Sequence, residues 1–536
     1  MRALDGAAST RPPMPAVTYA SNDSPALEGL HEGFEAALRQ VSSHLGENHP
    51  MLIGESEVIA VEWIEDRSPA DPSVLLARVP AGRPTEVERA IEVARGALSS
   101  WRATHWRERL DVLRRTADLV ERDAALLGAW LALEVGKPRM EAFGEAAELP
   151  TLIRYYCDQV EEAEGFSRPP AVVGDERARM LLRPYGVWAI VSPFNFPLAA
   201  GAGMAVGAIA GGNVAIMKPA SDAPLLSLLF ARAARAAGMP AGVLSVITGD
   251  AERVGRPLVA HAGIDGVAFT GSVSAGMAIS DMMARSPIRR PFIGEMGGKN
   301  PVIVTSSADL DEAVEGIVKS AFGFAGQKCS ATSRVYAVEG IADALVERLR
   351  TRVESLTIGE PTERATFVGP VINGAAVERY EMAVDDARRH GHLVTGGRRS
   401  PDRPGFFVEP TLVTSLPLRH RLLRDELFLP ILPVAAVPDF DAAISEANAT
   451  SFGLCAGLFS RDDREIDRFF DEVEAGVLYV NRRAGATSGA WPGVQPFTGW
   501  CASGSSGKGA LGPWYVQQFL REQARTLVAR TSPLSA

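Results

Sequence analysis

The chain has 536 residues, of which 46% are hydrophobic, so it is long enough to bury several large cores. Its formal net charge is −10 and its basic residues form no long run, so a nucleic acid is not expected as a partner. The four cysteines, Cys157, Cys329, Cys455 and Cys501, lie far apart without CxxC or Cys/His spacing, which indicates neither a zinc site nor a disulfide framework and favours the reducing cytoplasm.

The N-terminal residues lack the order of charged, apolar and small segments that marks a signal peptide. Residues 1–26 are expected to form a mobile tail. A run without charged residues from Pro184 to Met217 raises the alternative of a membrane span. Pro193, Pro197 and Gly211-Gly212 divide this run into pieces too short to cross a bilayer, so no membrane partner is expected.

Amphipathic helices dominate the first part of the chain. Apolar residues spaced by three or four predict helices over Leu27–Leu45, from Thr85 to Trp101, and over Trp106–Ala125, Leu126–Val135 and Glu141–Glu162. Strand-like runs occur at Val58–Val61 and Val74–Val79. Thr85 and Glu88 have the spacing of a capping box. The charged residues of these helices are expected on solvated faces, so this part is interpreted as scaffold.

From Ala171 onward, apolar runs of strand length alternate with helical ones. The strands are expected at Gly186–Val191, Asn213–Met217, Val243–Thr248, Gly266–Phe269 and Phe292-Ile293, and the helices at Leu198–Ala210, Ala223–Ala237, Ala251–His261 and Ser274–Ala284. Continuous Val, Ile and Ala runs joined by helices predict a parallel sheet that is covered on both faces. Ligands of such sheets bind at the carboxyl ends of the strands.

Two candidate residues follow the first two strands. Asn195 lies between two aromatic residues and two prolines, in Pro193-Phe194-Asn195-Phe196-Pro197, and a rigidly held amide is a good donor to a developing oxyanion. The alternative is an ordinary turn asparagine. Lys218 ends the second strand, where it could reach a ribose or a phosphate. The alternative is an ordinary surface lysine.

Two further candidates follow later strands. Phe269–Gly276 runs from a strand through a glycine turn into a helix, where backbone N–H groups can meet a pyrophosphate, although the spacing is not that of the GxGxxG fingerprint. Glu295 is flanked by Gly294 and Gly297. It is either a turn residue or an accessible base with room for substrate and water.

One cysteine stands in a distinctive stretch, Gly326-Gln327-Lys328-Cys329-Ser330, between a predicted helix (Asp311–Phe324) and a predicted strand (Ser333–Val338). Gly326 allows the backbone to bend beside the thiol. Lys328 is expected to favour the thiolate, and Ser330 to leave room for a substrate. The alternative is a buried structural cysteine, the common fate of a free thiol.

The order and spacing of these five motifs resemble the NAD(P)-dependent aldehyde dehydrogenase superfamily, over about Leu52 to Val528. Glu426-Leu427-Phe428 and Gly493–Phe497 also resemble motifs of that family. The resemblance implies an α/β aldehyde dehydrogenase fold in several parts. These are an NAD(P)-binding Rossmann-like domain (27–179 and 186–296), an α/β catalytic domain (297–480), a substrate-anchor and channel loop (481–506), and a small β oligomerisation arm (180–185 and 507–536).

The resemblance also implies the roles of single residues. Cys329 would attack the aldehyde carbon, Asn195 and the Cys329 N–H would stabilise the oxyanion, and Glu295 would activate the water that hydrolyses the thioester. The implied cofactor contacts are Ser192, Pro193, Phe194, Lys218, Ser221, Gly271, Ser272, Gly276, Glu426 and Phe428. The implied substrate contacts are Phe196, Ser330, Gly489, Ala490 and Phe497. No metal site is expected.

Within the superfamily, details of the chain are most similar to the L-glutamate γ-semialdehyde (1-pyrroline-5-carboxylate) dehydrogenases. They are Ser330 after the nucleophile, Ser221 where many relatives carry glutamate, and Ser488–Gly493, similar to a loop that binds the amino-acid end of the substrate through backbone N–H groups. This implies oxidation of L-glutamate 5-semialdehyde to L-glutamate, a step of proline catabolism. One alternative is another aldehyde, such as a succinylated, aliphatic or aromatic one. A second alternative is a catalytically silent binding protein.

Some residues depart from the pattern of the family. Leu429 stands where a glycine is usual, Thr498 and Cys501 alter the motif after Phe497, and Arg482–Thr487 lengthens the anchor loop. The expected cofactor is NAD. Because Ser221 lacks a negative charge that would repel a 2′-phosphate, the sequence leaves NADP open. The resemblance also implies a homodimer or higher homo-oligomer that works in the cytoplasm on a small-molecule aldehyde.

Overall fold

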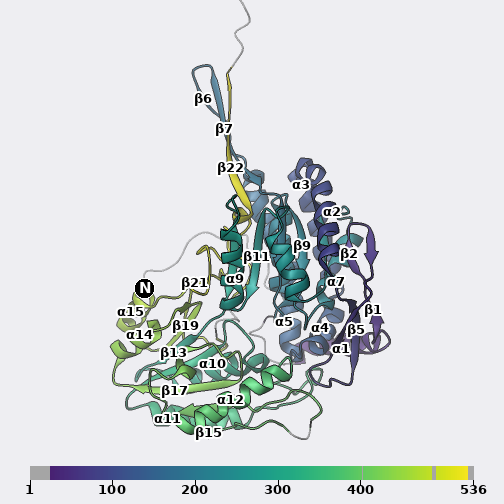
Figure 1. Cartoon of the computed structure of the whole chain (residues 1–536). Coiled ribbons are helices and arrows are strands. Elements are labelled where there is room, and N and C mark those ends of the chain that lie inside the picture. Colours follow the sequence, from purple (N-terminus) through teal and green to yellow (C-terminus); the bar gives the residue numbers. More distant parts are fainter. Residues whose placement is uncertain (1–17, 19–24, 401–402, 486–489, 529–536) are drawn as a thin grey trace, which may run out of the picture.

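The computed structural model describes residue 18 and residues 25–400, 403–485 and 490–528. Two large sheets, each accompanied by helices, form the body of the molecule, and a long narrow arm projects from it (Figure 1). The α/β fold expected from the sequence is confirmed. The tail predicted for residues 1–26 lies almost entirely outside the described residues.

The first large sheet is built around a parallel core. Its order is β12 (Phe292–Met296), β11 (Gly266–Gly271), β8 (Val187–Val191), β9 (Val214–Lys218), β10 (Leu244–Val246), β2 (Met51–Ile53) and β3 (Ser56–Val58). The five strands from β12 to β10 run parallel, whereas β2 and β3 are antiparallel additions. All five residues of β9 are buried, as expected for a strand covered on both faces.

Helices of the first half of the chain accompany this sheet. They are α1 (Glu28–Ser42), α2 (Pro84–Ala103), α3 (Trp106–Arg122), α4 (Ala124–Glu134), α5 (Arg139–Glu162), α6 (Gly203–Ala210), α7 (Leu225–Ala236), α8 (Arg256–Ala260) and α9 (Val273–Ala284). π-Helical turns over Pro197–Ala202 and Ala251–Gly255 precede α6 and α8. No helix in the described part of the chain is long and apolar enough to span a bilayer.

Two local predictions for this part were wrong. The N-cap of α2 is Arg83 rather than Thr85, and the carboxylate of Glu86, not Glu88, accepts from the N-cap N–H, at 2.8 Å. Pro84 is compatible with the first helical position because it needs no N–H donor there, so the helix begins one residue earlier than the pattern indicated. The strand predicted for Val58–Val61 ends at Val58, and Val61 is exposed to solvent.

The second large sheet has the order β15 (His392–Thr395), β16 (Thr411–Thr414), β17 (Ile431–Val437), β14 (Thr332–Val338), β13 (Asn300–Val304), β19 (Cys455–Phe459) and β20 (Val477–Val480). All neighbours are parallel except β15 and β16. The accompanying helices are α10 (Leu310–Phe322), α11 (Ala342–Glu354), α12 (Gly374–His390), α13 (Arg421–Arg424), α14 (Phe440–Asn448) and α15 (Asp463–Glu472).

Three small sheets complete the fold. They pair β1 (Glu47–Asn48), β5 (Leu75–Pro80) and β4 (Trp63–Arg67); β18 (Phe452–Gly453) and β21 (Trp500–Cys501); and β22 (Leu520–Val528), β7 (Glu176–Pro184) and β6 (Ala171–Val173). The last sheet is the arm of Figure 1, in which β22 pairs with the whole length of β7. This sheet begins at Ala171, well before the boundary at residue 180 that the sequence suggested for the arm.

Candidate active site

The loop between α10 and β14 carries Cys329 and is held in an unusual conformation. Phe324 and Ala325 have φ of 50° and 53°, and Gly326 follows with φ of 70°. A Cβ on Gly326 would lie 2.6 Å from the Leu429 carbonyl oxygen, so both the dihedral angle and the space require glycine. The side-chain amide of Asn300 donates to the Cys329 carbonyl at 2.7 Å, which anchors the loop to β13. Cys329 is therefore presented from a strained, tightly tied turn.

One cavity with about 680 Å³ of open space brings together residues that are far apart in the sequence. Asn195, Glu295 and Cys329 all line it. They come from the loop after β8, from the end of β12 and from the loop before β14. Glu295 lies inside β12, which continues to Met296, rather than after the strand as the sequence indicated. Cys329, Asn195 and Glu295 thus line the same cavity.

Asn195 is fixed by its hydrogen bonds. Its Nδ2 donates to the Gln327 carbonyl oxygen at 2.9 Å, two residues before the cysteine. The Asn195 side chain is buried, and Nδ2 has a second hydrogen that this bond does not use. The amide therefore has one N–H for the nucleophile loop and one for a group in the cavity.

Burial controls the ionisation of Glu295 and Cys329. Burial, with a smaller contribution from the negative charge of Glu148, raises the pKa of Glu295 to about 8. Burial also raises the pKa of the Cys329 thiol well above its usual value, and Glu295 adds to this effect. The backbone N–H of Ser330 acts in the opposite direction. A thiol in this setting needs a nearby proton acceptor, and Glu295 lines the same cavity.

The role predicted for Lys328 was wrong. Its ammonium group forms an ion pair with Glu141 of α5, and it is not among the groups that perturb the Cys329 thiol. The charges of α5 were expected on a solvated face, yet Glu141, Glu145 and Glu148 point inward. The charge of Lys328 serves to hold the loop to α5 and not to ionise the thiol.

Three of the predicted cofactor residues lie at the carboxyl ends of adjacent parallel strands. Ser192 directly follows β8, Lys218 ends the neighbouring β9, and Gly271 ends β11 on the other side. The Ser192 hydroxyl is buried without a hydrogen-bond partner among the described residues. Burial lowers the pKa of Lys218 to about 8, and its ammonium group donates to the Pro219 carbonyl at 2.8 Å. Hydroxyl and ammonium donors at a sheet edge suit ribose and phosphate groups.

Two further predicted residues, Ser221 and Ser272, flank this edge of the sheet, one after β9 and one after β11. Ser221 follows β9, and its hydroxyl donates to the Gly249 carbonyl at 3.4 Å. Ser272 is the N-cap of α9, where its hydroxyl accepts from the Ala275 N–H. Gly276, in the first turn of α9, packs against Met296 of β12 and leaves no space for a side chain. The structure gives Gly276 a packing role, whereas its predicted contact with the cofactor stays a prediction.

Residues from the second half of the chain meet the loop after β8. The ring of Phe428, whose φ is 59°, stands edge-on to that of Phe194 with centroids 5.9 Å apart. Pro193 directly precedes Phe194. Glu426 accepts from the Gly298 N–H at 2.8 Å, and burial raises the pKa of this carboxyl group to about 7. These residues converge close to the turn that follows Glu295.

Four of the five predicted substrate residues line the cavity. They are Phe196, Ser330, Ala490 and Phe497. The fifth, Gly489, belongs to residues 486–489 of the predicted anchor loop, which lie outside the described residues. Leu429, one of the departures from the family pattern, is buried, and its carbonyl packs against Gly326. Cys501 is exposed in β21.

Sequence reasoning missed part of the cavity wall. Glu148 and Tyr156 reach it from α5, and Tyr515 from the segment before the arm, where its ring stacks on Tyr156 with centroids 5.3 Å apart. Glu148 and Tyr156 belong to a helix whose sequence pattern indicates a part of the scaffold. The only available signal was the spacing of Glu141, Glu145 and Glu148, which places three acids on one helix face.

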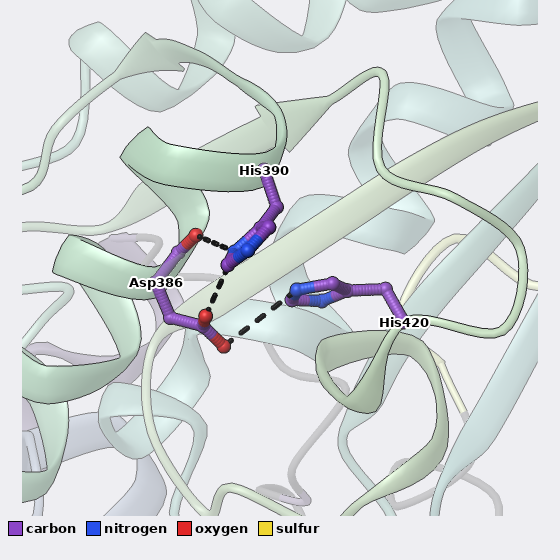
Figure 2. A group of neighbouring side chains, drawn as sticks. All are labelled: Asp386, His390 and His420. Atoms are coloured by element: carbon purple, nitrogen blue, oxygen red, sulfur yellow. Dashed lines mark hydrogen bonds and ion pairs between the residues drawn. The ribbon is translucent and has the colours of Figure 1, made fainter.

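A cluster of metal-ligand residue types lies elsewhere, where α12 meets α13 (Figure 2). Asp386 contacts His390 at 3.0 Å and His420 at 3.7 Å. The carboxylate of Asp386 also accepts from Arg421 at 2.6 Å, and His420 Nδ1 accepts from the Leu422 N–H, which leaves the hydrogen on Nε2 facing Asp386. These contacts describe one carboxylate surrounded by two imidazoles and a guanidinium, which joins the two helices.

Comparison with known proteins agrees with this arrangement. The profile of the aldehyde dehydrogenase family matches residues 59–524. The 1-pyrroline-5-carboxylate dehydrogenase of Geobacillus thermodenitrificans (strain NG80-2) is 37% identical over 510 residues, which are 94% of this chain and 96% of that protein.

Solved structures agree as well. The 1-pyrroline-5-carboxylate dehydrogenase from Thermus with bound NAD superposes with a TM-score of 0.91 at 32% identity, covering 97% of this chain and all of that one. A 3,6-anhydro-L-galactose dehydrogenase in complex with NAP gives a TM-score of 0.83 at 30% identity, covering 90% of this chain and all of that one. The chain belongs to the aldehyde dehydrogenase family.

Proposed function

We propose that the protein oxidises L-glutamate 5-semialdehyde to L-glutamate with NAD⁺ as the hydride acceptor. The observation that carries this proposal is the single cavity lined by Cys329, Asn195, Glu295 and Glu148. The first three are the groups that thioester chemistry requires. The fourth is a buried carboxylate that would attract the ammonium group of an amino-acid substrate.

The chemistry follows from the nature of these groups. Glu295 accepts the proton of the Cys329 thiol, directly or through a water, and the thiolate attacks the aldehyde carbon. The oxyanion that develops is stabilised by the free N–H of Asn195 and by the backbone N–H of Cys329. Bound NAD⁺ would supply the hydride acceptor that allows the thiohemiacetal on Cys329 to become a thioester. After Glu295 has released the thiol proton to solvent, its carboxylate takes a proton from the water that attacks the thioester. The C–S bond then breaks, Cys329 leaves as the thiolate and the carboxylate product is released.

Charge around Lys218 supports NAD rather than NADP. Lys218 lies near two carboxylates, Asp222 and Asp250, both of which stabilise its ammonium form. Two carboxylates close to the lysine would repel a 2′-phosphate even though Ser221 itself is neutral. The Thermus relative was solved with NAD, whereas the 3,6-anhydro-L-galactose dehydrogenase holds NAP.

The arm supports the proposal of a homo-oligomer. β22 is an edge strand, and Val172, Val173, Met180 and Leu527 of this sheet expose more than half of their surface. An exposed strand edge with apolar residues is a typical site for pairing with a second copy. A cytoplasmic location is proposed as well, since all four cysteines are free thiols.

A panel of aldehydes with NAD⁺ and NADP⁺, followed by absorbance of the reduced cofactor, tests the proposed substrate. The kcat/KM for glutamate semialdehyde is expected to exceed that for propanal or a succinylated semialdehyde by at least about 10²-fold, because a buried polar site discriminates strongly against substrates that leave it unpaired. A higher kcat/KM for any other aldehyde of the panel would assign the protein to a different substrate.

Replacing the nucleophile tests the chemistry. Cys329→Ala is expected to abolish aldehyde oxidation while NAD⁺ still binds, as measured by quenching of tryptophan fluorescence. Cys501→Ala is the matched control, because this exposed thiol lies in β21 and should leave turnover unchanged. Turnover that survives in Cys329→Ala would rule out a covalent mechanism at this cysteine, and a wild-type chain that oxidises no aldehyde would favour the catalytically silent alternative.

A further inference from the structure

A buried lysine lies directly behind the loop that carries Asn195. Lys137, in the turn between α4 and α5, has no exposed surface, and neither has its ion-pair partner Glu145 of α5. The Lys137 ammonium group donates to the backbone carbonyl oxygen of Asn195 at 2.8 Å. A fully buried ion pair costs several kcal/mol in lost hydration, so its presence needs an explanation other than stability.

The same ammonium group touches both catalytic loops. It lies 3.8 Å from the ring centroid of Phe196, the residue after Asn195, and 4.8 Å from that of Phe324 in the cysteine loop. Lys137 thus lies between the two loops that Asn195 Nδ2 and the Gln327 carbonyl join by a direct hydrogen bond. Movement of Lys137 would change the distance between the amide of Asn195 and the sulfur of Cys329.

Glu145, the partner of Lys137, binds the segment that follows the Asn195 loop. One of its carboxylate oxygens accepts from the backbone N–H groups of Leu198 and Ala199, at 3.0 and 3.1 Å. These residues belong to the π-helical turn Pro197–Ala202 that directly follows the Asn195 loop. The ion pair therefore holds this segment at two points, the carbonyl of Asn195 and the start of the turn that follows it.

We propose that the Lys137–Glu145 pair is a positioning device that fixes Asn195 so that its free N–H points at the oxyanion. Neither side chain is among the residues that line the cavity, so both act through Asn195 rather than on the substrate. The inference rests on the proposed role of Asn195 as an oxyanion donor. A misplacement of about 1 Å in such a group can cost about 10²-fold in rate.

A double-mutant cycle with Asn195 tests this inference. Asn195→Ala alone is expected to lower kcat about 10²–10³-fold, the usual cost of a lost oxyanion donor. Lys137→Met alone is expected to lower kcat about 10–100-fold with the Kd of NAD⁺ unchanged. In the Asn195→Ala background, Lys137→Met should lower kcat by no more than about 3-fold, because the amide that Lys137 positions is already absent.

Two further variants separate positioning from folding. Arg139→Met removes another buried cation two residues away, whose contacts are with Thr362 and Glu35, so it should reduce thermal stability without the loss of kcat. The double variant Lys137→Met/Glu145→Gln leaves no charge at either position of the buried pair. It is expected to fold even if Lys137→Met does not, and it should show the same loss of kcat as Lys137→Met.

Each outcome decides the question. Equal effects of Lys137→Met with and without Asn195 would overturn the positioning role, and so would wild-type kcat in the neutral double variant. If Asn195→Ala alone leaves kcat unchanged, the proposed oxyanion role fails first and the inference fails with it. The inference is supported if the losses of kcat in Lys137→Met and Asn195→Ala are non-additive and the kcat of Arg139→Met equals that of wild type.

Discussion

Glu295 has the environment of a general base whose ionisation is opposed by its surroundings. Its carboxyl group lies in a mostly apolar cavity with a second acid, Glu148, nearby, and its pKa of about 8 follows from this burial. A base with a pKa near the working pH combines a useful fraction of carboxylate with good affinity for a proton. The elevated pKa also has a cost for folding, because the unfolded chain ionises this group several pH units earlier.

Glu295→Gln tests that cost. The folded wild-type protein holds a proton on Glu295 up to about pH 8, whereas the ordinary pKa of a glutamate, expected in the unfolded chain, is 4.5. Between these values the folded state binds more protons than the unfolded state, so wild-type stability falls as the pH rises and levels off above about pH 8. The Glu295→Gln variant has no ionisable group at this position, so it lacks this decrease in stability with rising pH. Its Tm is expected to exceed that of wild type by at least about 2 °C at pH 9, with no advantage at pH 4.5.

Thermal unfolding followed by fluorescence across this pH range gives both curves. Because the comparison is a difference between two proteins that share all other titrating groups, the remaining pH dependence cancels. A constant Tm difference at every pH would mean that Glu295 is ionised as readily in the folded protein as in the unfolded chain.

At the scale of elements, α9 and β12 form a packed pair that supports two functional turns. α9 begins at the Ser272 turn, where the cofactor is expected, and β12 ends with Glu295-Met296. β11 joins them, with Thr270 opposite Glu295 and Gly271 opposite Met296 in the sheet. Gly276 allows the close approach of α9 to Met296.

Gly276→Val should separate this pair. The new side chain meets Met296 and the ring of Phe269, so α9 must move away from the sheet, at a cost of about 1–3 kcal/mol in unfolding free energy. Since the Ser272 turn moves with the helix, the Kd of NAD⁺ should rise several-fold, measured by isothermal titration calorimetry.

Gly96→Ala is the matched control for this variant. No atom lies within 4 Å of the new methyl group in α2, and alanine favours a helix interior over glycine, so stability should increase by about 0.5–1 kcal/mol with cofactor affinity unchanged. If Gly276→Val loses stability but binds NAD⁺ as tightly as wild type, the turn at Ser272 does not contact the cofactor.

At the scale of the whole molecule, the cavity belongs to neither large sheet alone. Asn195 and Glu295 are attached to the first sheet, and Cys329 precedes a strand of the second. The arm extends away from both and contributes no residue to this cavity in the described part of the chain. Its long β7–β22 pair has little burial beyond Leu520 and Pro184, which is the observation behind the proposal that the arm pairs with a second copy.

Removing part of the arm tests the proposed oligomer. A chain that ends after Glu522 retains the buried Leu520 and loses most of β22, so it is expected to elute as a monomer, slightly below the 57.1 kDa of one full chain. The full chain is expected at twice that mass or more by light scattering. A chain that ends after Val528 is the control, because it keeps the whole strand. An unchanged mass after the shorter truncation would assign subunit contacts to another surface.

Much of the fold and of the site was predictable from the sequence. The parallel strands around Val187–Val191 and Val214–Lys218 were visible because both faces are buried and the apolar runs are continuous. Loops such as Pro193–Pro197 and Gly326–Ser330 were recognisable because their function demands rare combinations of residue types. Helix starts and strand ends were missed by a few residues where a cap or a proline decided them.

The sequence by itself determined the α/β fold class, because the periodicity of apolar residues is local. The resemblance of its motifs to the family also predicted which loops carry Asn195 and Cys329. Only the tertiary structure decided which charges act at the site. Glu141, Glu145 and Glu148 look like one polar face of an ordinary helix, and Lys137 like a residue of a turn. They are buried against loops about 50 to 190 residues away, and no spacing in the sequence reports such a distant contact. Burial changes what these charges do, since a carboxylate deprived of water must find a partner, and the partners here are the loops that carry Asn195 and Cys329.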